Sequence, residues 1–315
     1  MNPKAKSRLL TVLFVLLLAV AIVLVLGYMD IISHGKKASE EKCNVNVQEL
    51  SFYDGGEKIF GRLFLPDTEN LSDEPTLIYV HGYGLNGDFG EGICKAVAEM
   101  GFPAYSFDFR GGGPESRSSG SMMEMSVETE IKDLEIVLDR IRKMPFADKK
   151  QIYLLGHSQG GLVATMAASR KHKEVAGLIL MAPAFDIPKK GKELYRREAD
   201  IPDTSKVGKY FVGRNYYSDI RSLKPYKEMK GYKKPVLIIH GDGDTVVNLQ
   251  WSDVATQVLK DVRLEILEGC DHKFSGSGEK QAILLIKEFM REQSGNETAS
   301  QARQRRRRIK EKEAY

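Results

Sequence analysis

The chain has 315 residues, which is enough for a single large domain carrying an insertion. Its apolar and charged fractions, 42% and 29%, are ordinary for a globular protein and exclude wholesale disorder. The formal net charge of +4 comes largely from Arg303 and the block 305–308, so the body is near neutral and no nucleic-acid groove is indicated.

The N-terminus has the pattern of a membrane anchor. Three cations precede an apolar run from Leu9 to Leu26 that only Thr11 interrupts, a length near the minimum for spanning a bilayer. We expect an uncleaved signal anchor over residues 1–29, a polar tether over 30–44, and a body on the extracytoplasmic side of the cell membrane. A cleaved signal peptide is the alternative, because Ala19-Val20-Ala21 imitates a cleavage site, although five more apolar residues follow it.

Cysteine content and the C-terminus add two expectations. The three cysteines, Cys43, Cys94 and Cys270, are scattered and odd in number, which supports neither a zinc site nor a disulfide framework. Whether one pair forms a disulfide stays open, and no metal or cofactor is expected. Residues 293–315 are polar with four consecutive arginines, a composition that predicts a disordered basic tail.

The body, residues 45–292, reads as short strands alternating with helices. Val45–Tyr53 alternates in polarity, and Asp54-Gly55-Gly56 turns it into Lys58–Leu65, which predicts an antiparallel hairpin. Further strands are predicted at Leu77–Val80, Ala104–Phe109, Ile152–Leu155, Leu178–Met181, Val236–Ile239 and Leu264–Leu267. Helices are predicted at Glu91–Met100, Val127–Met144, Leu162–Arg170, Trp251–Leu259 and Gln281–Met290.

This alternation predicts the fold class. Short, continuously apolar strands between amphipathic helices indicate an α/β fold with a mostly parallel sheet covered on both faces, and the hairpin adds an antiparallel edge. Residues 185–234 interrupt the alternation and are rich in Lys, Arg, Tyr and Asp. Because this insertion lacks a strong run of buried residues, we expect a cap that folds back over the carboxyl edge of the sheet and is more cover than core.

The most informative segment is Gly156-His157-Ser158-Gln159-Gly160, between a predicted strand and a predicted helix. A serine there occupies a tight strand-to-helix turn, and the glycines permit its strained backbone. The helix N-terminus beneath it favours a developing oxyanion. We therefore expect Ser158 to be a nucleophile; the alternative is a glycine-rich turn with an incidental serine.

A nucleophilic serine needs a base and an acid, and both follow in chain order. His272 is the only histidine beyond the last predicted strand, which makes it the expected base. Asp242 and Asp244 both follow the strand that ends at Ile239; Asp244 is the favoured acid because it lies at the far end of the loop. Asp271 is expected to face solvent or to cap its own turn.

The oxyanion requires two backbone N–H donors. Gln159, directly after the nucleophile, supplies one, and Tyr83 in the segment His81-Gly82-Tyr83-Gly84 is the expected second. We expect His81 to brace this loop. We expect His157 to pack beside the strand-to-helix turn that carries Ser158, the nucleophile elbow. The segment Gly111-Gly112-Gly113 lacks the Lys-Ser/Thr of a phosphate loop and indicates a flexible loop beside the active-site mouth.

Six segments together resemble bacterial α/β-hydrolase esterases, above all cinnamoyl and feruloyl esterases, and behind them monoacylglycerol lipase and lysophospholipase-like hydrolases. They are His81–Gly84 with Asn86-Gly87, Asp108–Gly111, Gly156–Gly161, Met181–Ala184, His240–Val247 and Gly269–Phe274. The resemblance covers about Val45–Met290. It implies Ser158, Asp244 and His272 as the triad, Tyr83 and Gln159 as oxyanion donors, and a substrate-selecting cap. Gly112 departs from the histidine that such esterases often carry, which leaves the substrate open.

These features predict a serine hydrolase that cleaves carboxylic esters through an acyl-enzyme, with a small ester or lipid-like substrate. A lysophospholipase, monoacylglycerol lipase, peptidase or acyltransferase could use the same triad. A dehalogenase or epoxide hydrolase would need a carboxylate at position 158. A non-catalytic, membrane-tethered binding module is a further alternative, which an intact triad in the correct order disfavours.

Overall fold

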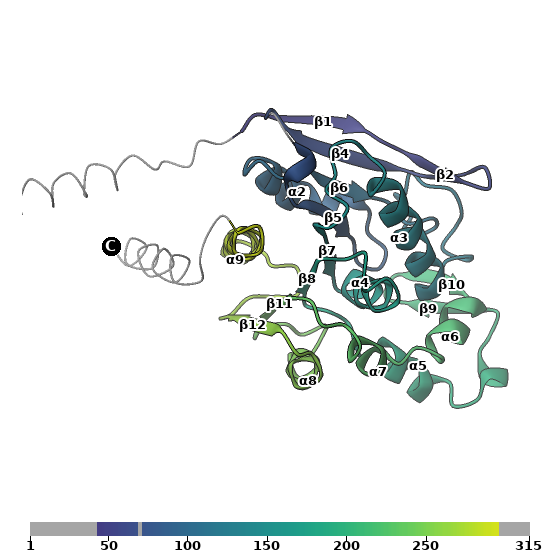
Figure 1. Cartoon of the computed structure of the whole chain (residues 1–315). Coiled ribbons are helices and arrows are strands. Elements are labelled where there is room, and N and C mark those ends of the chain that lie inside the picture. The colour runs from purple at the N-terminus through teal and green to yellow at the C-terminus, as the bar shows by residue number, and fades with distance from the viewer. Residues whose placement is uncertain (1–42, 69–70, 296–315) are drawn as a thin grey trace, which may run out of the picture. The chain divides into compact units, whose positions relative to one another are not determined.

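The computed structural model describes residues 43–68 and 71–295, and within them the main feature is an eight-stranded sheet (Figure 1). The strands, in their order across the sheet, are β1 (Val45–Glu49), β4 (Gly61–Pro66), β6 (Ala104–Phe107), β5 (Thr76–Val80), β7 (Ile152–His157), β8 (Gly177–Met181), β11 (Val236–Gly241) and β12 (Val262–Leu267). The six strands from β6 to β12 run parallel, whereas β1 and β4 pair antiparallel at one edge. The predicted fold class is confirmed.

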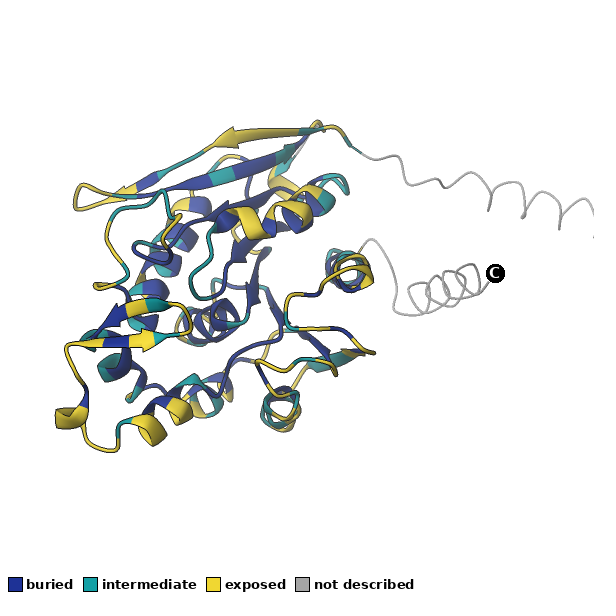
Figure 2. Cartoon of the chain, turned by 180° about the vertical axis from the view of Figure 1, so that it is seen from behind, coloured by how far each residue is buried: buried dark blue, intermediate teal, exposed yellow. Residues whose placement is uncertain are grey.

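Helices cover both faces of the sheet, with two separate apolar clusters beneath them. α2 (Glu91–Ala98) and α9 (Ser277–Gln293) pack on one face, and α3 (Val127–Ile141), α4 (Gln159–Arg170) and α8 (Gln250–Val258) pack on the other. Strand residues alternate between the clusters: Leu154 of β7 points into one, and Tyr153 and Leu155 into the other. Figure 2 shows the central strands as buried and the edge strand β1 as largely exposed.

The N-terminal hairpin forms two ladders and not one. β1 pairs with β4 in the main sheet, while β2 (Phe52–Asp54) and β3 (Glu57–Ile59) form a separate two-stranded ribbon around the Gly55-Gly56 turn. Both glycines have positive φ angles, 58° and 91°, which side chains rarely adopt. The turn expected at this position is therefore present.

The insertion between β8 and β11 contains α5 (Ile187–Leu194), α6 (Arg214–Ile220), α7 (Pro225–Met229) and a hairpin of β9 (Thr204–Val207) with β10 (Tyr210–Gly213). We call residues 185–234 the cap. Besides covering the sheet edge, the cap contributes Val212, Tyr216, Ile220 and Tyr232 to the buried cluster that includes α3 and α4. The cap's apolar residues are spread along the sequence, so no single run revealed their burial.

Two short helical turns, η1 (Leu71–Asp73) and η2 (Gly87–Gly90), precede α2, and η3 (Glu198–Asp200) lies in the cap. The predicted anchor and tether, and most of the predicted tail, fall on residues 1–42 and 296–315, outside the described residues. Among the helices of residues 43–68 and 71–295, none combines the length and apolarity needed to cross a bilayer.

Candidate active site

Ser158 lies on a strained turn between β7 and α4. Its φ and ψ angles are 56° and −121°, in a region that residues with a Cβ rarely adopt. The turn is fixed from both sides, because the Ser158 N–H donates to Met181 O (2.9 Å) and the Ser158 carbonyl accepts from the N–H of Ala184 (3.0 Å). The helix therefore begins at Gln159 rather than at the predicted Leu162.

The glycines of the elbow are required by close approach of backbone. A Cβ on Gly156 would collide with the carbonyl of Gly160, and a Cβ on Gly160 would collide with the carbonyls of Val80 and His81. The turn is thus in close contact with the end of β5. The segment His81–Gly84, which carries the expected donor Tyr83 and is called the oxyanion loop below, begins there. These contacts account for the glycines in chemical terms and favour the elbow over an incidental turn.

Ser158, His272 and Asp244 form one chain of hydrogen bonds above the carboxyl edge of the sheet. His272 Nε2 lies 2.9 Å from Ser158 Oγ, and His272 Nδ1 lies 2.7 Å from Asp244 Oδ2. A carboxylate only accepts, so Nδ1 carries the hydrogen and Nε2 is free to accept the serine proton. The three residues come from three loops that are 114 and 28 positions apart in sequence.

Asp244 is held as an anion by its surroundings. Its Oδ1 accepts the N–H groups of Val246 (2.8 Å) and Val247 (2.9 Å), and His240 Nε2 lies 3.2 Å from its Oδ2. Burial alone would raise the pKa of Asp244, but the hydrogen bonds from Val247, His272 and Val246 outweigh it and lower the pKa below 3.8. The carboxylate is therefore ionised at neutral pH.

His240 is a supporting residue that the sequence reasoning missed. It is fully buried; its Nε2–H donates to Val247 O (3.0 Å), and its Nδ1 accepts from Ser252 Oγ (2.7 Å). It therefore braces the loop that carries Asp244. Its position at the end of a strand, four residues before the acid, was the available signal.

The other two candidate carboxylates have local roles. Asp242 Oδ1 accepts the Gly269 N–H at 2.6 Å. This bond connects the loop that carries Asp244 (residues 242–249, the acid loop) with the loop that carries His272 (residues 268–276, the histidine loop). Asp271 accepts from the N–H and hydroxyl of Ser275, at 2.8 Å each, and caps its own turn. Of the three, only Asp244 is hydrogen-bonded to the His272 ring within the described residues.

His157 contacts the histidine loop directly. Its Nε2–H donates to the backbone carbonyl of His272 at 2.8 Å, and its ring stacks on Phe89 with 5.2 Å between centroids. Burial lowers the pKa of His157 to about 4, so the ring is neutral beside the His272 imidazole. Besides packing at the elbow, His157 restrains the backbone of His272.

Among the described residues, the two expected oxyanion donors, the N–H groups of Tyr83 and Gln159, have no acceptor. Gly82 lies so close to the elbow that a Cβ there would be 3.1 Å from Ser158 Cβ, which brings the next residue, Tyr83, beside the nucleophile. Within residues 43–68 and 71–295, neither the Tyr83 N–H nor the Gln159 N–H donates to another backbone or side-chain group. Both donors are thus available to a ligand.

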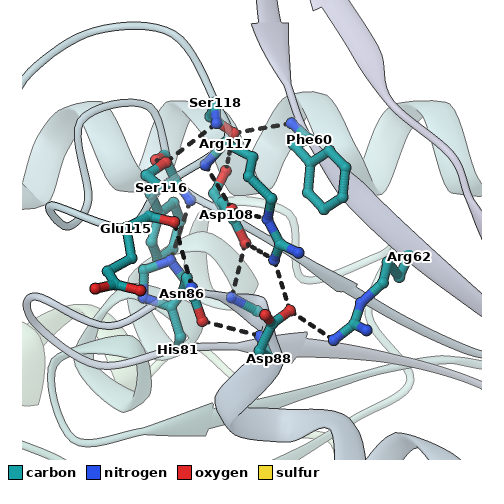
Figure 3. A network of polar contacts seen from close by, with 12 residues as sticks. Phe60, Arg62, His81, Asn86, Asp88, Asp108, Glu115, Ser116, Arg117 and Ser118 are labelled. Atoms are coloured by element: carbon teal, nitrogen blue, oxygen red, sulfur yellow. Dashed lines mark hydrogen bonds and ion pairs between the residues drawn. The ribbon is translucent and has the colours of Figure 1, made fainter.

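A polar network holds the oxyanion loop from behind (Figure 3). Asp108, fully buried at the end of β6, accepts the Gly87 N–H (2.8 Å) and the Nε of Arg117 (3.0 Å). Arg117 also pairs with Asp88 (2.6 Å), which pairs in turn with Arg62. The network joins three chain segments and fixes the position of the loop that carries Tyr83.

His81 braces the same loop, as expected. Its Nδ1–H donates to Gly82 O (2.9 Å), and its Nε2 accepts the Phe109 N–H (3.1 Å), so the buried ring is neutral. Gly112 packs against it: a Cβ at this position would lie 2.7 Å from Phe109 Cβ and 3.1 Å from His81 Cε1. Gly112 O also accepts the Gly84 N–H (3.1 Å). The Gly111–Gly113 segment therefore supports the oxyanion loop.

An open groove lies beside the acid loop. It has a volume of about 600 Å³ and is lined by residues in or next to α5, α7 and the start of α8: Phe185, Pro188, Lys189, Lys192, Glu193, Arg196, Leu223, Pro225, Tyr226 and Trp251. A second cavity of about 340 Å³ shares Lys189, Glu193 and Trp251 with this groove and reaches Asp244 and Val246. A mainly apolar lining that also carries Lys189, Lys192 and Arg196 thus adjoins the loop that carries Asp244.

Comparison with known families agrees with this geometry. The sequence model of the family described as serine aminopeptidase S33 matches residues 72–226, which include Ser158 and end before Asp244 and His272. The solved structure of Est1E from Butyrivibrio proteoclasticus with bound ferulic acid is 26% identical, with a TM-score of 0.71, and the match covers 78% of this chain and 98% of that chain. The chain has the α/β-hydrolase fold. The recognition made from the motifs is confirmed.

Curated relatives of this chain include proteins that are named as lipases. The lysophosphatidylserine lipase of Danio rerio is 29% identical over 57% of this chain, and the monoglyceride lipase of Saccharomyces cerevisiae is 26% identical over 73% of this chain and 88% of its own length. The match spans 46% of the Danio rerio protein, less than half of its length. The α/β hydrolase GrgF from a Penicillium species, 19% identical with a TM-score of 0.65, shares the fold.

Proposed function

We propose that this protein is a serine hydrolase that cleaves carboxylic esters through an acyl-enzyme. The observation that carries the proposal is the unbroken chain from Ser158 Oγ through the His272 ring to the ionised Asp244. A serine hydroxyl becomes an effective nucleophile when a positioned base takes its proton, and the base is effective when an anion orients it and stabilises its charged form.

Each step uses a group at a defined position. Ser158 Oγ attacks the ester carbonyl carbon while His272 Nε2 takes the hydroxyl proton. The carbonyl oxygen becomes an oxyanion that the N–H groups of Tyr83 and Gln159 stabilise. The C–O bond to the alcohol then breaks, and His272 returns the proton to the leaving oxygen. Water repeats the sequence on the acyl-enzyme, releases the acid and restores Ser158.

For the substrate, we propose an ester with a single acyl chain, as in a monoacyl lipid. The groove beside the acid loop supports this class, because its lining is mainly apolar and Lys192 and Arg196 in that lining form no ion pair within the described residues. Relatives named as monoglyceride and lysophosphatidylserine lipases point the same way. An anchor over residues 1–29 would place such an enzyme at a membrane, and this too is a proposal.

An aromatic carboxylic ester is the second candidate. The structure of Est1E was determined with ferulic acid bound, and Est1E aligns with this chain over 98% of its length. A screen with the full chain separates the classes: p-nitrophenyl esters of increasing acyl length, a monoacylglycerol and a feruloyl ester are compared by kcat/KM. A rise with acyl length supports the lipid class, and preference for the feruloyl ester supports the aromatic class.

The catalytic proposal is tested with Ser158→Ala. The full chain should hydrolyse a short p-nitrophenyl ester at neutral pH and be labelled by a fluorophosphonate, and the variant should lose both while remaining folded. Equal turnover in the folded variant would contradict the proposal. Parallel amide and ester substrates with the same acyl group test the peptidase alternative, which predicts comparable rates on both.

A further inference from the structure

The side chain of Gln159, whose backbone N–H is an oxyanion donor in the proposed function, is clamped at both ends. Its Nε2 donates to Glu130 Oε2 of α3 at 2.8 Å, and its Oε1 accepts the hydroxyl of Tyr216 of α6 at 2.7 Å. All three residues are almost completely buried, with exposed fractions of 1% for Glu130, 1% for Gln159 and 4% for Tyr216. Glu130 thus holds Gln159 from α3, outside the cap, and Tyr216 holds it from the cap.

The second oxyanion donor residue is also fastened to the cap. The Tyr83 hydroxyl lies 3.3 Å from Val207 O of β9, and its ring lies edge-on to Tyr216 with 5.9 Å between centroids. Beside it, a Cβ on Gly84 would be 2.5 Å from the ring of Tyr210. The cap therefore contacts both residues that carry the proposed oxyanion donors. The hairpin and α6 contact the Tyr83 segment, and α6 also contacts Gln159.

Glu130 is the unusual member of this arrangement. Its Oε1 has no hydrogen-bond partner, and it faces Asp133 on its own helix, Gln159 on α4, and the Tyr83 and Tyr216 hydroxyls. Burial raises the pKa of Glu130 to about 8; the Gln159 hydrogen bond opposes this rise and Asp133, itself paired with Arg110, adds to it. At neutral pH the carboxyl is mostly protonated, so no full charge lies behind the oxyanion donor.

We propose that Tyr216 and Glu130 are positioning residues for the oxyanion hole, and that the cap thereby forms part of the catalytic framework as well as the substrate site. The inference rests on the proposed function. Gln159 is the first residue of α4, where no preceding helical turn restrains it. A side chain held by two buried hydrogen bonds removes that freedom and keeps the N–H directed at the developing charge.

The size of the effect follows from what a donor contributes. Complete removal of one oxyanion donor costs a factor of about 10² to 10³ in kcat. Loosening the donor by losing one of the two side-chain hydrogen bonds should cost less, about three- to tenfold in kcat. KM should change little, because the oxyanion exists only in the transition state.

The test compares two neighbouring tyrosines of α6 in the full chain. Tyr216→Phe removes the hydroxyl that binds Gln159. Tyr217→Phe is the matched control, because within the described residues Tyr217 makes ring contacts with Tyr195 and Tyr216 but its hydroxyl has no hydrogen bond. We expect a three- to tenfold lower kcat for Tyr216→Phe, with KM close to that of the control and a melting temperature lower by only a few degrees, because one buried hydrogen bond is lost. Equal kcat in the two variants would overturn the inference.

A second pair of variants tests whether Gln159 needs a hydrogen-bond acceptor at position 130 or a negative charge there. Glu130→Gln keeps an acceptor for Gln159 and should retain kcat at pH 7, whereas Glu130→Met removes it and should lower kcat as Tyr216→Phe does. Equal kcat in the Gln and Met variants contradicts the role of Glu130; if the Met variant does not fold, the tyrosine pair decides alone. Failure of the proposed function is distinct, since the wild-type chain itself would then show no ester turnover.

Discussion

The buried carboxylate behind the oxyanion loop provides a sharp test of the structure. Asp108 and Asp88 both pair with Arg117, but the Asp108 side chain is 0% exposed and the Asp88 side chain is 46% exposed. Asp108→Asn places an amide against donors of Arg117 that need an acceptor, while Asp88→Asn makes the same chemical change in contact with water. Comparing the two isolates the effect of burial.

The expected magnitudes differ several-fold. Breaking a buried ion pair by removing one partner costs about 3–5 kcal/mol. Arg117 is 35% exposed, so part of its charge is screened and we expect about 2–3 kcal/mol for Asp108→Asn. An exposed pair contributes about 0–1 kcal/mol, which sets the expectation for Asp88→Asn. In urea, the first variant should unfold at a midpoint lower by about 1 M, and the second close to wild type.

The measurement is urea unfolding of the full chain followed by far-UV circular dichroism, at pH 7 and at pH 3. Burial raises the pKa of Asp108, but hydrogen bonds from Arg117 and Gly87 outweigh this and hold it below 3.8. Its stabilising effect is therefore present above 3.8 and is lost as pH falls through the lowered pKa. The difference in urea midpoint between wild type and Asp108→Asn should therefore be smaller at pH 3 than at pH 7. Equal midpoints for the two variants at pH 7 would refute this reasoning.

Three further predictions concern the proposed acid, Asp244, and two supporting residues, His157 and Glu130. Asp244→Asn should lower kcat by about 10⁴ in ester hydrolysis, because His272 would adopt the wrong tautomer; a loss below tenfold would contradict the assigned acid. His157→Phe should lower kcat about three- to tenfold, because the His272 carbonyl loses its hydrogen-bond donor. The shape of the profile of kcat against pH from 5 to 8 should stay unchanged, since the pKa of His157 is about 4. A shifted profile would argue against a neutral His157 ring. For Glu130, whose pKa is raised from 4.5 to about 8, native stability should fall as pH rises through that window, by at most about 1.4 kcal/mol per pH unit, and Glu130→Gln should remove this slope in chemical unfolding. Parallel stability curves for wild type and variant would contradict that pKa.

The fold was predictable because its signals are local. The strands at the centre of the sheet are short apolar runs, and the elbow is a contiguous five-residue pattern at the end of one of them. His272 was identified because no other histidine follows the last predicted strand. Two aspartates followed the neighbouring strand, and sequence position alone favoured Asp244; the structure brings that carboxylate to the His272 ring.

The supporting network was not predictable, because its partners are distant in sequence and ordinary in type. Glu130 and Tyr216 lie 29 and 57 residues from Gln159, on helices whose rotation depends on packing. The buried residues of the cap were hard to identify for the same reason: Val212 and Tyr216 belong to the cluster that includes α3 and α4, and not to any apolar run of their own. Such placements depend on tertiary structure.

The most direct test is to trap the covalent intermediate. The full chain is mixed with an excess of a slowly deacylating p-nitrophenyl ester, quenched in acid, digested and analysed by mass spectrometry. The account predicts one acyl group on the peptide that contains Ser158, formed with a stoichiometric burst of nitrophenol. Turnover without a burst, or an acyl group on another residue while Ser158→Ala keeps full activity, would contradict it.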